Sequence, residues 1–195
     1  MIFLVGPHGS GKTELGKRVS ENGFHYLDLG PIVRNYYAKS TEFSNIGEWV
    51  DAGEKVLGIN FADYLLANEV LQYVYKNNVD LEKLVISGNR QLIGIMFLVN
   101  FFSEFKGKKV DYSITYIDAP VETLLERYNK RDGKNLTMEE FKAKFAKEDE
   151  TLNEIRWVVN NVINNTGTVD EMYDTFVSGL EKVDREIGSH LKVLN

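Results

Sequence analysis

Eight consecutive residues near the amino terminus follow the pattern G-x-x-x-x-G-K-[ST]; they are Gly6-Pro7-His8-Gly9-Ser10-Gly11-Lys12-Thr13. In this pattern the glycines let backbone N–H groups wrap around a chain of phosphates, and the helix that follows adds positive potential. The mechanism requires a strand before the loop and a helix after it. Residues 2–5 (IFLV) form an apolar run that is too short for a helix, and helical spacing begins at Thr13. We therefore expect a phosphate-binding loop between a buried strand and a helix.

The rest of the chain alternates between strand and helix patterns. After residues 2–5, further short β-branched or apolar runs predict strands at 25–29, 83–87, 112–118 and 161–165. Helical patterns lie between and after them, at 13–22, from Pro31 onward, 46–52, 60–75, 91–105, from 119 onward, from 137 onward and from 168 to near 188. This alternation predicts a three-layer α/β/α sandwich on a five-stranded parallel sheet, with all 195 residues in one domain.

Several details of these helices can be predicted. Gly53 is expected to end the helix at 46–52, and Tyr64, Leu71 and Val74 are expected to form the apolar stripe of the helix at 60–75. Residues 137–140 (TMEE) and 168–171 (TVDE) both follow the capping-box pattern, which places a helix start at each of them.

Charge and composition exclude several classes of protein. With 23 basic and 29 acidic residues the net charge is −6, so the chain lacks the general basic field of non-specific nucleic-acid binders. The absence of cysteine excludes disulfides, thiolate metal sites and thiol nucleophiles. No apolar run is long enough for a membrane span, and no signal-peptide pattern is present. We expect a cytoplasmic protein with a small-molecule partner, no nucleic-acid or membrane partner, and a monomeric or homodimeric state.

The phosphate-binding loop assigns a role to each of its residues. Backbone N–H groups of residues 6–13 would hold the phosphates of ATP, and Lys12 would bridge the β- and γ-phosphates as a point charge. The hydroxyl of Thr13 would enter the coordination shell of Mg²⁺. ATP and Mg²⁺ are therefore the expected cofactors.

Beyond this loop, the chain resembles the P-loop NTPases of the nucleoside monophosphate kinase group, above all adenylate kinases and the related dephospho-coenzyme A kinases. Four segments in the order of that family carry the resemblance: 27–34 (LDLGPIVR), 51–56 (DAGEKV), 87–90 (SGNR) and 118–120 (DAP) with the arginines that follow. The resemblance implies the sheet order 2-3-1-4-5, an acceptor-binding arm at about 31–75 and a short lid at about 127–147.

The resemblance also implies roles for four arginines. Arg34 and Arg90 would hold the phosphate of the acceptor, while Arg127 and Arg131 would meet the transferred group from the lid. Other roles are open: Arg34 as an exposed cation of a first helical turn, Arg90 as the partner of a carboxylate, and the lid arginines as part of a solvated helix face. The motif 129–132 (NKRD) matches the guanine signature N-K-x-D, but it continues a predicted helix, so we do not assign it that role.

Two departures from the family pattern affect the chemistry. Ser87 replaces the acidic residue that usually helps to organise Mg²⁺ at the end of the third strand. Two alternatives are open: Asp28 or Asp118 substitutes for it, or Thr13 with water molecules is enough. Asp28 also bears on the acceptor, because a hydroxyl acceptor benefits from a nearby carboxylate whereas a phosphate needs no base. The alternative role of Asp28 is to bind loop N–H groups at the strand end.

The leading functional hypothesis is an ATP-dependent kinase that transfers the γ-phosphoryl group to a nucleoside or deoxynucleoside monophosphate. The alternatives are a hydroxyl kinase of the dephospho-coenzyme A type and a non-catalytic nucleotide-binding protein. The last of these is motivated by the serine at position 87.

Overall fold

The computed structural model describes residues 1–40, 42–58 and 60–193, with side chains described up to Val183. Within these residues it contains one parallel sheet in the order β2-β3-β1-β4-β5, which confirms the expected topology. The strands are β1 (Ile2–Val5), β2 (His25–Asp28), β3 (Leu84–Ser87), β4 (Ser113–Asp118) and β5 (Asn161–Asn164). The two edge strands are less buried than expected, and Ile163 alone is fully buried in β5.

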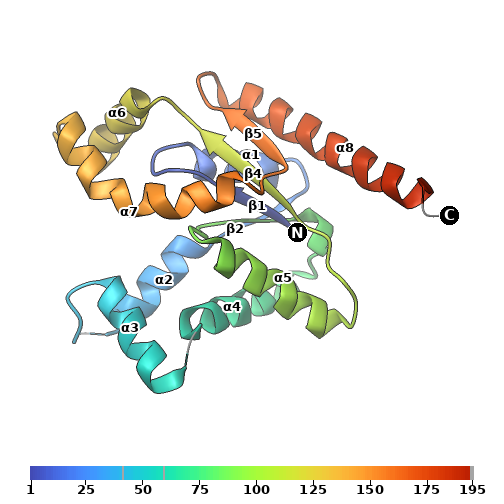
Figure 1. The fold of residues 1–195 in the computed structure, drawn as a ribbon, viewed down its shortest axis with the longest axis horizontal. Coiled ribbons are helices and arrows are strands. Elements are labelled where there is room, and N and C mark those ends of the chain that lie inside the picture. The colour runs from blue at the N-terminus through green and yellow to red at the C-terminus, as the bar shows by residue number, and fades with distance from the viewer. Residues whose placement is uncertain (41, 59, 194–195) are drawn as a thin grey trace.

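Alternation along β1 assigns its side chains to two separate cores. Phe3 and Val5 pack with α4 (Phe61–Asn77), α5 (Leu92–Lys106) and the second half of α7 (Met138–Arg156). Ile2 and Leu4 pack on the other face with α1 (Lys12–Ser20) and α8 (Val169–Val193). The helices therefore cover both faces of the sheet, with α1 and α8 together on one of them (Figure 1). This arrangement is the predicted three-layer sandwich.

Two predicted details of the first half of the chain are wrong. The helix α2 (Leu29–Ala38) begins before Pro31, because Asp28 caps it by accepting a hydrogen bond from the N–H of Gly30 at 3.0 Å. The helix α3 (Ile46–Leu57) continues through Gly53, where the ring of Phe61 occupies the position that a side chain would take. The glycine therefore permits close packing and does not end the helix.

The apolar stripe of α4 agrees with the prediction in part. Val74 is buried as predicted, together with Ala67 and Val70, and Leu71 packs against the same core. Tyr64 is instead 59% exposed, and its ring contacts that of Phe97. At the carboxyl end, α8 continues past residue 188 to Val193. None of the helices in the described part of the chain is long and apolar enough to cross a lipid bilayer.

The helix α6 (Val121–Asp132) and the first half of α7 pack around a third, smaller core. Leu124, Tyr128 and Phe141 are its buried members, and Phe145 packs against them. The capping box at Thr137 that begins α7 is present as predicted, since its hydroxyl accepts from the N–H of Glu140 while the carboxylate of Glu140 accepts from the N–H of Thr137. The expected lid region therefore has its own apolar support, apart from the two cores of the sheet.

Candidate active site

The loop between β1 and α1 requires glycine for two reasons: its backbone has positive φ angles, and neighbouring atoms leave no space for a side chain. Gly6, Gly9 and Gly11 have positive φ angles of 144°, 84° and 102°, a region that side chains rarely adopt. A Cβ atom at Gly6 would overlap the carbonyl oxygen of Ile117, and one at Gly11 would overlap the side-chain nitrogen of Asn165. The glycines of the predicted motif thus stand where β4 and β5 approach the loop.

Lys12 folds back over its own loop. Its amine donates to the carbonyl oxygens of Gly6 and Pro7 at 2.7 and 2.8 Å, and it lies 3.3 Å from the hydroxyl of Ser10. Burial lowers the pKa of Lys12 from 10.5 to about 8, despite the nearby carboxylates of Glu148 and Asp28. A phosphate in the loop would supply the negative charge that this buried amine lacks.

Asn165 is a structural partner of the loop that the sequence analysis did not identify. Its side chain is buried and donates to the carbonyl oxygen of Ser10 at 2.7 Å. Its own N–H donates to the carbonyl oxygen of Asp118 at 2.7 Å. Asn165 follows β5 directly, so the rule that ligand sites form at the carboxyl ends of parallel strands offered one signal for it.

Both lid arginines face the phosphate-binding loop. Arg127 donates to the carbonyl oxygen of Gly9 at 3.2 Å, and Arg131 lies 2.6 Å from Nε2 of His8. His8 stacks on the ring of Phe145, with centroids 5.2 Å apart. Burial, followed by the charge of Arg131 and other nearby cations, lowers the pKa of His8 to about 4. The imidazole is therefore neutral at pH 7, and the arginines supply the positive charge here.

Arg90 is ion-paired in this structure. Its guanidinium donates to the carboxylate of Glu148 on α7 at 2.8 Å, and the Glu148 side chain is only 7% exposed. The alternative that Arg90 pairs with a carboxylate is thus observed, although both residues line the cleft that contains the loop. Glu148 was not identified from sequence, because a glutamate within a charged helix carries no distinguishing pattern.

Asp28 and Arg34 lie at the start of α2. The Asp28 carboxylate caps this helix, which is its alternative predicted role, and it also lines the cleft. The Arg34 guanidinium and the Asp28 carboxylate both lie close to Gly30. Each is 3.2 Å from the position that a Cβ atom on this glycine would take. Arg34 is exposed and makes no hydrogen bond or ion pair with the described part of the chain, which leaves its donors available to a ligand.

At the end of β3, a pair of hydroxyl groups stands where the family pattern has a carboxylate. Ser87 is buried, and its hydroxyl lies 2.7 Å from that of Tyr26. Asp118 does not line the cleft; its Oδ1 accepts from the N–H of Ala119 and lies 3.6 Å from Arg156. Of the two predicted substitutes, Asp28 is therefore the one beside the loop.

These side chains meet in one cleft of ≈ 1120 Å³. Pockets for a single small ligand typically measure about 300–1,000 Å³, so this cleft has room for two molecules side by side. It brings together the predicted residues Lys12, Thr13, Asp28 and the four arginines with Glu148 and Asn165, as well as Asp63 from the arm and Asn89 from the loop after β3.

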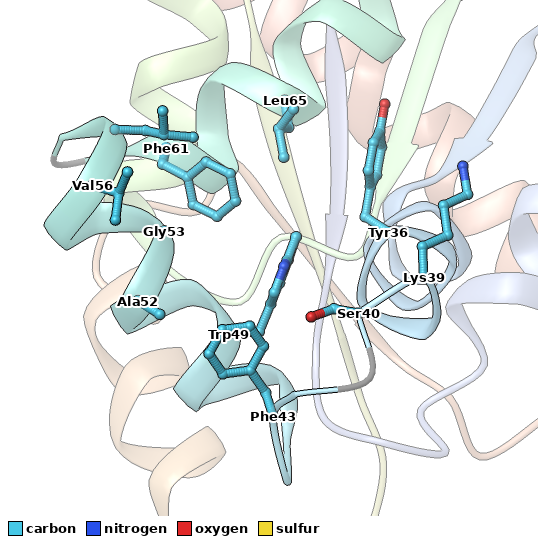
Figure 2. Close-up of a pocket in the computed structure, with 11 residues that line it drawn as sticks. Tyr36, Lys39, Ser40, Phe43, Trp49, Ala52, Gly53, Val56, Phe61 and Leu65 are labelled. Atoms are coloured by element: carbon cyan, nitrogen blue, oxygen red, sulfur yellow. The ribbon is translucent and has the colours of Figure 1, made fainter.

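A second cavity of ≈ 470 Å³ lies on the predicted arm and contains no residue of the loop. Figure 2 shows side chains from α2 and the residues just after it on one side, with side chains of α3 and the start of α4 on the other. Phe43, Trp49 and Phe61 contribute much of its apolar lining. The segment 51–56 borders this cavity through Ala52, Gly53 and Val56 and does not line the main cleft.

Comparison with known proteins identifies the fold. No protein-family model matches the chain, and no curated protein sequence matches it. Among solved structures, a gluconokinase from Sinorhizobium meliloti matches with a TM-score of 0.59 at 16% identity, over 97% of this chain and 95% of that chain.

Two shikimate kinases match over similar lengths. The enzyme from Aquifex aeolicus has a TM-score of 0.54 at 18% identity, over 94% of this chain and 97% of that one. The enzyme from Acinetobacter baumannii, solved in complex with shikimate, has a TM-score of 0.52 at 18% identity, over 96% and 93% of the two chains. The chain therefore has the fold of the small P-loop kinases; identities this low establish no more than the fold.

Proposed function

We propose that the protein is an ATP-dependent kinase that transfers the γ-phosphoryl group to a small anionic acceptor. The observation that carries the proposal is the single cleft in which a phosphate-binding loop, four arginines and a carboxylate from separate elements converge. Phosphoryl transfer depends mainly on positioning and on neutralising charge. A cleft with room for two ligands, with cations along its length, suits that task.

In this proposal the loop residues 6–13 bind ATP, and Lys12 exchanges the carbonyl oxygens of Gly6 and Pro7 for phosphate oxygens. Arg127 and Arg131 already face the loop from α6 and would contact the transferred group. The Thr13 hydroxyl suits Mg²⁺, which usually takes few protein ligands and keeps several waters. Asp28 in β2 is the register partner of Ser87 in β3, so its carboxylate stands next to the position where the family pattern has an acidic residue.

For the acceptor, the leading proposal is a nucleoside or deoxynucleoside monophosphate. Arg34 and Arg90 come from different elements and line the same cleft, and two such arginines suit a dianionic phosphate. Arg34 has free donors, whereas Arg90 would have to leave Glu148 or share its guanidinium between the two anions.

A hydroxyl acceptor is the second candidate, and Asp28 favours it. This carboxylate lines the cleft together with Lys12, and among the described residues only the N–H of Gly30 bonds to it, at one of its two oxygens. Its other oxygen is available to take a proton from an attacking hydroxyl. The structural neighbours, gluconokinase and shikimate kinase, are named for acceptors that carry hydroxyl groups. The dephospho-coenzyme A kinases of the sequence resemblance likewise imply a hydroxyl acceptor.

ADP formation from Mg·ATP would be measured with a panel of acceptors: nucleoside and deoxynucleoside monophosphates, dephospho-coenzyme A, gluconate and shikimate. Lys12→Ala is the blank. We expect one acceptor class to stimulate turnover in the wild type and none to do so in the blank. If ATP binds but no acceptor raises turnover, the kinase proposal fails in favour of the non-catalytic alternative.

Asp28→Asn separates the two acceptor classes. For a hydroxyl acceptor we expect kcat to fall by about 100-fold or more with little change in KM, because general-base catalysis contributes about 10²–10⁴-fold. For a phosphate acceptor we expect a change of less than about tenfold, because no base is needed. Circular dichroism checks that α2 survives the loss of charge at its cap.

A further inference from the structure

We infer that Asp63 and Asn89 bind the hydrogen-bond donors of the acceptor, and that the acceptor therefore carries two neighbouring N–H or O–H groups opposite its anionic end. The inference rests on the proposed function, because it assigns the substrate class of the same cleft. Asp63 belongs to no motif in the sequence, and Asn89 stands in the segment 87–90 (SGNR) without an assigned role there. Their placement in the structure therefore carries the argument.

The two side chains meet at the start of α5. Asp63 lies in the first turn of α4, Asn89 lies in the loop after β3, and both line the main cleft. A Cβ atom on Gly94 would lie 3.1 Å from Oδ1 of Asp63 and 3.3 Å from Nδ2 of Asn89. The glycine therefore leaves open the space that these two polar groups border.

Both side chains have unused hydrogen-bonding capacity. Oδ1 of Asn89 is buried and makes no hydrogen bond with the described residues. Within the same part of the chain, the Asp63 carboxylate makes neither a hydrogen bond nor an ion pair. A buried acceptor without a partner costs stability, and the half-buried carboxylate of Asp63 lies beside the buried Oδ1 of Asn89. The two together point to a ligand that supplies the donors.

The electrostatic environment of Asp63 agrees with this assignment. Burial, and to a lesser extent the nearby charge of Glu54, raises the pKa of the Asp63 carboxyl above its usual value. The carboxylate is thus poorly solvated and uncompensated by the protein. Donors on a ligand would stabilise its charged form.

The chemistry of Asp63 narrows the class of molecule that the acceptor can be. A carboxylate accepts two parallel hydrogen bonds, either from adjacent N–H groups of a nucleobase edge or from two hydroxyls of a polyhydroxy acid. Arg34, which lines the same cleft, would bind the anionic end of the molecule. An acceptor with an anionic group but no donors would leave Asp63 unpaired and would bind less well.

The experiment uses pairs of ligands that differ in their donors. Binding to the wild-type protein would be measured by calorimetry for guanosine against inosine monophosphate and for gluconate against hexanoate. We expect the donor-rich member of at least one pair to bind about tenfold or more tightly, as one hydrogen bond to a charged group predicts. The pair that shows the preference distinguishes a nucleobase from a polyhydroxy acid.

Asp63→Asn should remove this preference while leaving the Kd of ATP unchanged. Gly94→Ala should weaken the binding of the donor-rich ligand, because its methyl group fills the open space. Asp174→Asn, at an exposed position of α8 outside the cleft, is the matched control and should retain the preference. Thermal unfolding of each variant checks its fold, and Gly94→Ala keeps the test decisive if Asp63→Asn is unstable.

The outcomes separate this inference from the proposed function. If the wild type phosphorylates an acceptor but prefers neither member of any pair, or if Asp63→Asn keeps the preference, the inference is overturned and the kinase proposal stands. If the wild type neither binds nor phosphorylates any ligand of the panel, the proposed function is overturned and the inference with it.

Discussion

The glycines of the loop show what a short motif can predict. The pattern placed glycine at positions 6 and 11, and the structure shows a positive φ and a close backbone or side-chain neighbour at both. Asn165, Glu148 and Asp63, by contrast, are single polar residues without a pattern around them. Their roles depend on which elements the fold brings together. The position of Asn165 at the end of a predicted strand is the one signal that the sequence offered for any of the three.

Gly11→Ala should destabilise the protein by about 2 kcal/mol or more, because the new side chain has an unfavourable φ and overlaps the side chain of Asn165. ATP binding should be lost with it. Gly133→Ala is the control: its φ is also positive, at 60°, but no atom lies within 4 Å of the new Cβ. It should cost about 1 kcal/mol and leave ATP binding intact. Urea unfolding and calorimetry measure both effects, and equal losses in the two variants would contradict this account.

The lowered pKa of Lys12, about 8, predicts a pH dependence of ATP binding. Below pH 8 the amine is charged and ready to bind phosphate. Above pH 8 the free protein must take up a proton on Lys12 when it binds ATP, so the affinity for ATP should fall by about tenfold at pH 9. Because the folded state disfavours the charged amine, the same group should add stability as pH rises from 8 toward 10.5, the unfolded value.

Calorimetry in two buffers of different ionisation enthalpy detects this proton uptake directly. We expect uptake approaching one proton per ATP at pH 9 and little at pH 6.5, with none attributable to this group in Lys12→Met. An affinity and a proton count that do not change between these pH values would show that Lys12 keeps its ordinary pKa in the free protein.

At the scale of single elements, helix starts were predicted better than helix ends. The capping boxes at Thr137 and Thr168 are both present, because the pattern specifies the hydrogen bonds themselves. The end predicted at Gly53 was wrong, because the tertiary contact with Phe61 requires a glycine inside the helix. A glycine in sequence does not distinguish a helix end from a packing contact.

The capping box at Thr137 offers a test of the lid, because Thr137 begins α7 within the proposed lid. Thr137→Ala should cost about 1 kcal/mol of stability. Steady-state kinetics should also show a change in kcat or in the KM of ATP for this variant. Kinetic constants equal to those of the wild type would argue against a lid at 127–147.

The ion pair between Arg90 and Glu148 joins the loop after β3 to α7. Arg90→Ala should cost about 1 kcal/mol, since it leaves the nearly buried Glu148 without its partner while Arg90 itself is half exposed. Glu148→Ala in the same chain should recover part of the loss, with a coupling energy of about 0.5 kcal/mol or more in a double-mutant cycle. Strictly additive losses in urea unfolding would indicate that the pair contributes nothing.

For the whole molecule, the alternation of strands and helices was sufficient to predict the layers, and the resemblance supplied the strand order that the structure confirms. The division into three apolar cores was not predictable, because residues of one helix belong to different cores: Phe141 packs in the lid region, whereas Leu152 and Ile155 pack on the sheet. Glu148 lies between these two parts of α7, so a movement of the proposed lid would change the surroundings of Glu148.

The proposed kinase transfers phosphate between two molecules bound in the cleft. Phosphorus NMR of a reaction with Mg·ATP and the most stimulating acceptor tests it directly, because it identifies the product that receives the γ-phosphoryl group. We predict one phosphorylated acceptor for each ADP formed and no signal above background with Lys12→Ala. Release of inorganic phosphate at a rate independent of every acceptor would contradict the claim and would identify the protein as a nucleotide hydrolase.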